Sequence, residues 1–88
     1  MPRHIDICEY VQSGDTFRIA KQKWIRLASY EAPDEVEPNY VKARQLLSSL
    51  ILGKEIIYEP VEESYGRIVA KVWQDGKNVN DIMIQSTY

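Results

Sequence analysis

The stretch VQSGDTFRIAKQKWIRL, residues 11–27, decides the fold, because it encodes two short strands and the turns that lead into them. Phe17 and Ile19 alternate with polar neighbours, which predicts a strand with one apolar face. The Ser-Gly-Asp sequence at residues 13–15 is typical of a tight turn, since Gly accepts positive φ and Ser and Asp bond their own backbone. We therefore expect a turn that leads directly into a strand.

The end of the same stretch predicts a second strand after the turn at residues 21–23. Successive side chains of a strand point to opposite faces. Ile25 and Leu27 then share one face, and Trp24 and Arg26 share the other. Arg26 is therefore expected on the side away from the core.

Outward from this stretch, the alternation in residues 4–11 predicts a preceding strand. Residues 31–39 contain two prolines and no apolar period, so we expect an irregular loop. Asn39 is a suitable N-cap for a following helix, and Gly53 stands where a helix C-terminus favours positive φ. Apolar residues recur between them at helical spacing, at Tyr40, Ala43, Leu46, Leu47, Leu50 and Ile51.

The remainder of the chain predicts two more strands, at residues 56–58 and 68–73. A loop at 62–66 is expected between them. The second strand should end at the Asp75-Gly76 turn. A short C-terminal helix is predicted to begin with Asn80 as its N-cap and to include Ile82, Met83 and Ile84.

The expected order is three strands, one helix and two strands. This is the order of a five-stranded oligonucleotide/oligosaccharide-binding (OB) barrel, a mainly β (α+β) fold with one helix between strands 3 and 4. The short C-terminal helix follows the barrel. A generic α+β meander is the alternative that the pattern alone leaves open. With 88 residues, the chain predicts a single domain over residues 1–88.

Composition narrows the classes of function. A net charge of −2 argues against a broad basic surface that holds nucleic acid, so any such binding must be local. The single cysteine, Cys8, excludes an internal disulfide and is expected to be a small buried hydrophobe. No window approaches the roughly 18 apolar residues of a membrane span, and no export signal is evident. We expect no membrane partner and favour a cytoplasmic location.

Several charged residues have the chemistry that phosphodiester hydrolysis requires: a cation, an activated water and donors for the phosphoryl oxygens. Asp15 and Glu31 offer hard oxygen ligands for Ca²⁺ or Mg²⁺. Arg26 and Arg67 offer planar forks that match a phosphate. Asp34 is the nearby carboxylate that could act as general base. Each has a plain alternative, because Asp15 also suits a turn and the arginines also suit a solvated strand face.

Four short motifs occur in order: SGDT at residues 13–16, RL at 26–27, EAPD at 31–34 and YGR at 65–67. Together they resemble the motifs of the staphylococcal-nuclease-like (thermonuclease) family, and the resemblance covers nearly the whole chain. It implies the OB barrel as the fold. It also implies a Ca²⁺-dependent nuclease that acts on single-stranded DNA or RNA.

The resemblance implies a role for each matching residue. Asp15 and Glu31 would bind the metal, together with the backbone carbonyl of Ala32. Asp34 falls where the family has its general base. The remaining roles concern the nucleotide: Arg26 and Arg67 would bind the 5′-phosphate and stabilise the transition state, and Tyr65 would pack near the bound nucleotide.

The chain departs from the family pattern in three places. Ser13 replaces an acidic residue that supports the metal, Glu31 is one methylene longer than the family's aspartate, and Asp34 is one methylene shorter than its glutamate. A displacement of about 1 Å can cost on the order of 100-fold in rate. Two functions therefore stay open, a nuclease with weakened activity and a catalytically silent OB module that binds nucleic acid or protein.

The chain also stops after the predicted C-terminal helix, whereas family domains normally continue with a further helix over the barrel. Apolar surface left by this difference could be covered by a second subunit, which predicts a homo-oligomer. Alternatively, the sequence is a piece of a longer protein.

Overall fold

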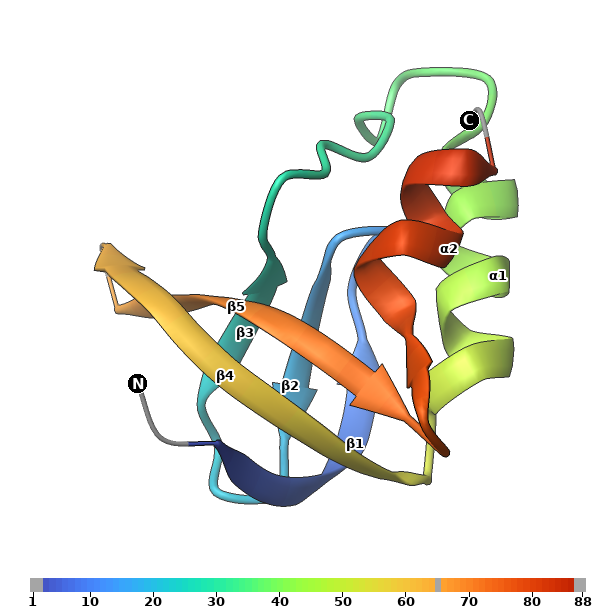
Figure 1. The fold of residues 1–88 in the computed structure, drawn as a ribbon. Helices are drawn as coiled ribbons and strands as arrows, with labels where there is room; N and C mark the ends of the chain where they lie inside the picture. Colours follow the sequence, from blue (N-terminus) through green and yellow to red (C-terminus); the bar gives the residue numbers. More distant parts are fainter. Residues whose placement is uncertain (1–2, 65, 87–88) are drawn as a thin grey trace.

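The computed structural model describes residues 3–64 and 66–86. Three strands come first, and helix α1 follows a long loop; two long strands, a two-residue strand and helix α2 complete the chain (Figure 1). The elements are β1 (His4–Val11), β2 (Thr16–Ile19), β3 (Trp24–Leu27), α1 (Tyr40–Ile51), β4 (Glu55–Ser64), β5 (Arg67–Gln74), β6 (Lys77–Asn78) and α2 (Val79–Gln85).

The sheet closes on itself as a barrel. Its strand order is β3-β2-β1-β4-β5-β6, with antiparallel neighbours throughout, and β3 also pairs with β5 in parallel. This last pairing joins the first strand of this order, β3, to β5 near its other end. Strands β1 to β5 therefore form the closed five-stranded barrel that the sequence predicted. Helices α1 and α2 lie side by side next to the barrel (Figure 1).

The core lies inside the barrel and beneath α1. Phe17, Ile19 and Ile25 are fully buried, and Leu27 is 1% exposed, so the predicted apolar faces of β2 and β3 are confirmed. Helix α1 buries Ala43, Leu47 and Ile51, as its apolar spacing predicted. Each fully buried aliphatic or aromatic side chain contributes about 1.5–3 kcal/mol through removal from water.

Of the two caps predicted for α1, the structure confirms the C-terminal one and only part of the N-terminal one. Gly53 has a φ of 75°, so the positive φ expected after the helix is confirmed. Asn39 occupies the N-cap position, yet its side chain makes no capping hydrogen bond. The helix N-terminus is therefore held by other contacts, described below.

Strand β4 is much longer than predicted. The expected loop at residues 62–66 is wrong, because the β4–β5 ladder continues to the pair Ser64 and Arg67. The register shifts between Pro60 and Glu62, which is how a strand accommodates a residue without an N–H. Glu62 and Glu63 are exposed and carry no apolar alternation, so the sequence held no local signal for this part of the strand.

The turn and helix after β5 confirm one prediction and correct another. Asp75 and Gly76 have φ values of 53° and 77° and connect β5 to β6 as a two-residue turn, as predicted. The cap of α2 is Asn78, whose Oδ1 accepts a hydrogen bond from the Asp81 backbone N–H at 3.0 Å. Asn80, the predicted cap, lies instead inside the first turn.

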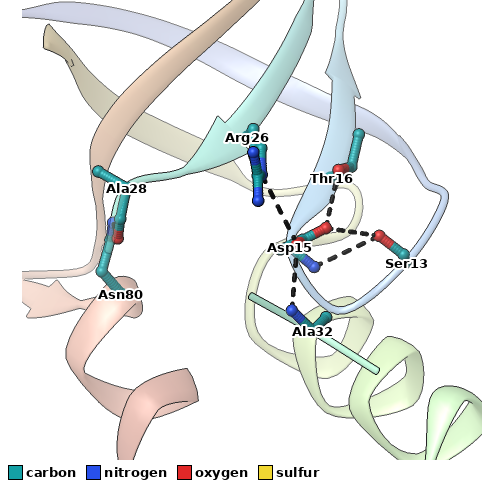
Figure 2. A network of polar contacts seen from close by, with 7 residues as sticks. All are labelled: Ser13, Asp15, Thr16, Arg26, Ala28, Ala32 and Asn80. Atoms are coloured by element: carbon teal, nitrogen blue, oxygen red, sulfur yellow. Dashed lines mark hydrogen bonds and ion pairs between the residues drawn. The ribbon is translucent and has the colours of Figure 1, made fainter. Parts of the chain in front are cut away.

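Asn80 is buried, with 5% of its surface exposed, and links three backbone segments. Its Oδ1 accepts from the Val72 N–H at 2.8 Å, and its Nδ2 donates to the carbonyls of Ala28 at 2.9 Å and Ala70 at 3.1 Å. Figure 2 shows Asn80 and Ala28 facing each other. The side chain therefore fastens α2 to β5 and to the end of β3, where the barrel closes.

Cys8 is fully buried, as predicted, and burial raises the pKa of its thiol to about 11. It is therefore an inert, protonated thiol at neutral pH. Ile5 and Ile7, on the other half of β1, are exposed by 59% and 47%. In the described part of the chain, neither helix is long and apolar enough to cross a membrane.

Candidate functional site

An open cleft of about 360 Å³ lies between the β1–β2 loop, β3, the start of β5 and the loop that follows β3. Six of the seven residues that the sequence singled out line this one cleft. Tyr65, the seventh, lies outside the described residues, so its predicted contact with a nucleotide has no structural counterpart here. The six are Asp15, Arg26, Glu31, Ala32, Asp34 and Arg67.

Strand pairing brings the two arginines to the same cleft. Arg26 pairs with Thr16 across the β2–β3 ladder and lies on the outer face of β3, as its alternation predicted. Arg67 pairs with Trp24 across the parallel β3–β5 ladder. Because Trp24 and Arg26 share one face of β3, both guanidinium groups emerge on the same side of the barrel.

Asp15 is the most heavily bonded side chain of the cleft (Figure 2). Its Oδ1 accepts from the hydroxyls of Ser13 and Thr16, each at 2.9 Å, and its Oδ2 accepts from the Ala32 backbone N–H at 3.1 Å. Arg26 Nε lies 3.8 Å from the same Oδ2, and 13% of the Asp15 side chain is exposed. These donors hold a negative charge in one orientation beside Arg26.

Ser13 holds Asp15 in place, a structural role that the sequence motif did not indicate. Where the family pattern has an acid, its hydroxyl donates to Asp15 and also accepts from the Asp15 backbone N–H at 3.4 Å. The substitution thus replaces a second negative charge by a neutral donor. The Ser13 hydroxyl therefore helps to orient the Asp15 carboxylate.

Gly14 is required for a different reason than predicted. The structure gives it no positive φ; the glycines with positive φ are Gly53, Gly66 and Gly76. A Cβ at Gly14 would lie 2.7 Å from the Ala43 Cβ and 3.0 Å from the Ala32 Cβ. Gly14 therefore allows the β1–β2 loop to lie against both helix α1 and the loop that carries Ala32.

Glu31 and Asp34 are both exposed at the rim of the cleft. Within the described residues, neither side chain makes a hydrogen bond or an ion pair; only the Asp34 backbone is bound, its N–H donating to Glu37 Oε1 at 2.9 Å. Both carboxylates are therefore free to change rotamer.

The donor chemistry of the cleft fits a hard cation. Ca²⁺ accepts carboxylates, backbone carbonyls and water in a flexible geometry, and Asp15, Glu31 and Ala32 offer the first two kinds of ligand. Across residues 3–64 and 66–86, however, no group of three or more His, Cys, Asp or Glu side chains is gathered for a metal. A cation here would therefore take several of its ligands from water or substrate.

Two further residues of the cleft, Tyr40 and Gln12, were not predicted. Tyr40, the first residue of α1, donates its hydroxyl to the Gln12 carbonyl at 2.6 Å, and both residues line the cleft. Arg44, one turn later, donates from Nε to the Val11 carbonyl at 3.1 Å. The sequence placed Tyr40 on the apolar face of the helix, and no local pattern indicates that its hydroxyl anchors α1 to the β1–β2 loop.

The chain is similar to known proteins over most of its length. The family model described as staphylococcal nuclease homologue matches residues 16–88. The chain is also similar to the probable staphylococcal-like nuclease CAN1 of Oryza sativa subsp. japonica, with 32% identity over 68 residues. That alignment covers 76% of this chain and 20% of the rice protein, so the chain spans about a fifth of the length of this relative.

Proposed function

This chain belongs to the staphylococcal nuclease family, and from that membership we propose that its cleft binds single-stranded DNA or RNA and hydrolyses a phosphodiester bond with Ca²⁺. The observation that carries the proposal is the convergence of Arg26 and Arg67, from neighbouring strands, on a cleft that also holds Asp15, Glu31 and Asp34.

The two arginines would bind the phosphate. A guanidinium presents planar donors that pair with two phosphate oxygens at once, and it stays charged at any physiological pH. Arg26 is restrained on one side by Asp15, at 3.8 Å, which limits the orientations it samples before substrate arrives. Donors placed in advance around the phosphoryl oxygens stabilise the charge that grows there in the transition state.

Asp34 would act as the general base. Its carboxylate is exposed at the cleft rim and has no partner among the described side chains, so it is free to take a proton from water. A base of this kind contributes typically 10²–10⁴-fold to rate when it lies within hydrogen-bonding reach of the water. Because Asp34 is shorter than the family's glutamate, we expect a weakened rather than a full contribution.

Asp15, Glu31 and the carbonyl of Ala32 would hold the Ca²⁺ ion. When bound, such an ion polarises a phosphoryl oxygen and favours ionisation of a coordinated water. The protein's own contribution is to orient Asp15, whose carboxylate is fixed by Ser13 and Thr16.

A second candidate function is nucleic-acid binding without hydrolysis. One observation favours it: both oxygens of Asp15 already accept hydrogen bonds from protein donors, at 2.9 Å and 3.1 Å. A cation would have to share or displace these donors. The arginine pair would still bind a phosphate in that case.

Cleavage of a fluorescent single-stranded oligonucleotide, with Ca²⁺ and with a chelator, tests the proposal. Arg67→Ala should abolish hydrolysis, whereas Lys71→Ala removes an exposed cation from the same strand outside the cleft and should leave it intact. Hydrolysis that persists with chelator or in Arg67→Ala would contradict the mechanism. Binding without turnover would favour the second candidate, and absence of binding would contradict both.

A further inference from the structure

Four side chains form a row across the outer face of the barrel, beside the cleft. Tyr10 on β1 pairs with Arg18 on β2, Arg18 pairs with Trp24 on β3, and Trp24 pairs with Arg67 on β5. Directly paired residues lie on the same face, and in antiparallel pairs their Cβ atoms are roughly 4.5–5.5 Å apart. Aromatic rings and guanidinium groups therefore alternate along this row, and Arg67 at its end lines the cleft.

A β-bulge in β1 directs Tyr10 to this outer face. The register of β1 against β2 shifts between Cys8 and Tyr10, so Glu9 is the extra residue. Cys8 and Val11 are both buried, and strict alternation after Cys8 would have placed Tyr10 in the core. Instead Tyr10 is 41% exposed. Bulges commonly redirect a side chain next to a functional site.

The first three members of the row contact one another. The rings of Tyr10 and Trp24 meet edge to face, with centroids 6.3 Å apart. The Arg18 guanidinium carbon lies 5.9 Å from the Tyr10 centroid and 5.8 Å from the Trp24 centroid. Glu9 Oε1 lies 3.8 Å from Arg18 Nε, beyond hydrogen-bonding distance, and both side chains are about 40% exposed. The three side chains form a preassembled platform with a positive charge.

The platform continues the cleft. Trp24 and Arg26 are two residues apart on one face of β3, a separation of roughly 6.6 Å along the strand. Although the net charge of the chain is −2, three arginines, Arg18, Arg26 and Arg67, therefore lie around the half-buried Trp24. Aromatic rings that stack bases, combined with cations along the backbone path, are the pattern by which proteins hold single-stranded nucleic acid.

We infer that Tyr10, Arg18 and Trp24 form a base-stacking subsite for the nucleotide whose phosphate occupies the cleft. The inference rests on the proposed function, because Arg26 and Arg67 supply the phosphate contact. Stacking on an aromatic ring tolerates any base, since every base has a π-face. The subsite therefore selects single strands, whose bases are exposed, over duplexes, and it does so without sequence preference.

Binding of a short labelled oligothymidylate and of an abasic chain of the same length, in chelator, tests the subsite. The two probes share their phosphates and differ in their bases. Trp24→Ala should weaken oligothymidylate binding by about 10-fold, as expected for the loss of one stacked base, and should leave the abasic chain unaffected. Tyr10→Ala should have a smaller effect in the same direction. Trp73→Ala, which removes the other tryptophan, is the matched control.

The outcomes separate this inference from the proposed function. Arg67→Ala should weaken binding of both probes, because it removes a guanidinium that would contact the phosphate. If Arg67→Ala weakens binding of both probes while Trp24→Ala and Tyr10→Ala bind oligothymidylate like the wild type, the stacking subsite is refuted. Phosphate binding in the cleft is then still supported. Equal weakening of both probes by Trp24→Ala would indicate a structural role and also refute it. Failure of the wild type to bind either probe would refute the subsite together with the proposed function.

Thermal unfolding of each variant verifies that it folds. Should Trp24→Ala unfold, Tyr10→Ala carries the test, because Tyr10 is 41% exposed and is not part of the core.

Discussion

Ala32 donates its backbone N–H to Oδ2 of Asp15 at 3.1 Å, joining residues 17 positions apart in the sequence. This hydrogen bond fastens the loop after β3 to the β1–β2 loop, and with them the two halves of the cleft. Asp15 therefore positions Glu31 and Asp34, which lie on either side of Ala32. The residue that would bind the cation also shapes the site around it.

Replacement of Asp15 should cost stability as well as activity. Asp15→Ala leaves three donors without their acceptor, and hydrogen bonds to a charged group contribute about 1.5–3 kcal/mol. We expect the free energy of unfolding to fall by roughly 2–3 kcal/mol in urea titrations. Asp34→Ala is the matched control and should change stability by less than about 0.5 kcal/mol, because its side chain is exposed and has no partner among the described residues. Equal effects of the two variants would contradict this.

Substitution of Gly14 should disturb the site through packing. The added Cβ of Gly14→Ala would lie 2.7 Å from the Ala43 Cβ, so α1 or the loop must move, at a cost of about 1–3 kcal/mol. The double variant with Ala43→Gly should recover part of the loss, which a thermodynamic double-mutant cycle measures. Strict additivity of the two substitutions would exclude the contact as the cause. Gly53→Ala, which meets no atom within 4 Å, should show no such coupling.

Asn80 should contribute more to the free energy of unfolding than Asn78, the N-cap of α2. Asn80→Ala removes three buried hydrogen bonds and takes the Asn80 partner from the Val72 N–H and the Ala28 carbonyl, whereas the Ala70 carbonyl keeps its hydrogen bond from the Ala28 N–H. The free energy of unfolding should fall by roughly 3 kcal/mol or more. Asn78→Ala removes only the helix cap and should cost about 0.5–2 kcal/mol. Chemical denaturation of both variants measures which loses more free energy of unfolding. A larger loss for Asn78→Ala would contradict the role of the three Asn80 hydrogen bonds.

Stability should decline at alkaline pH because of Cys8. Burial raises the pKa of this thiol from 9.0 to about 11. Below pH 9 the thiol is protonated in both folded and unfolded chains and adds no pH dependence. Between pH 9 and 11 the unfolded chain loses this proton while the folded chain retains it, so stability falls by up to about 1.4 kcal/mol per pH unit.

Cys8→Ala should have a shallower decline over the same interval. Comparing slopes cancels other alkaline titrations, including that of Tyr58, whose pKa is also raised by burial. Identical slopes in the two proteins would show that Cys8 does not contribute.

Calcium should stabilise the folded chain if the cleft binds it. A ligand at 100 times its dissociation constant stabilises by about 2.7 kcal/mol, which appears as a higher midpoint of thermal unfolding. Glu31→Ala should lose most of this shift, while Glu55→Ala, which removes an exposed acid that does not line the cleft, should keep it. A shift of equal size in both variants would indicate that the cation binds elsewhere. Removal of Ca²⁺ by a chelator should return the midpoint of unfolding to its original value.

The strands β1, β2 and β3 and the helix α1 were predictable because their signals are local. Alternation within Phe17–Ile19 and Trp24–Leu27 follows from the direction of successive side chains on a strand, and the apolar spacing of α1 follows from its 3.6-residue turn. The gathering of Asp15, Arg26 and Arg67 was predictable from their order in the family's motifs.

Other features arise only when distant segments meet, and the tertiary structure alone decided them. The need for Gly14 depends on Ala43, and the burial of Asn80 depends on the carbonyls of Ala28 and Ala70. The outward direction of Tyr10 depends on one extra residue in the pairing of β1 with β2. Local pattern fixes which face a side chain takes within its own element; barrel closure fixes which neighbour it meets, because those contacts join residues far apart along the chain.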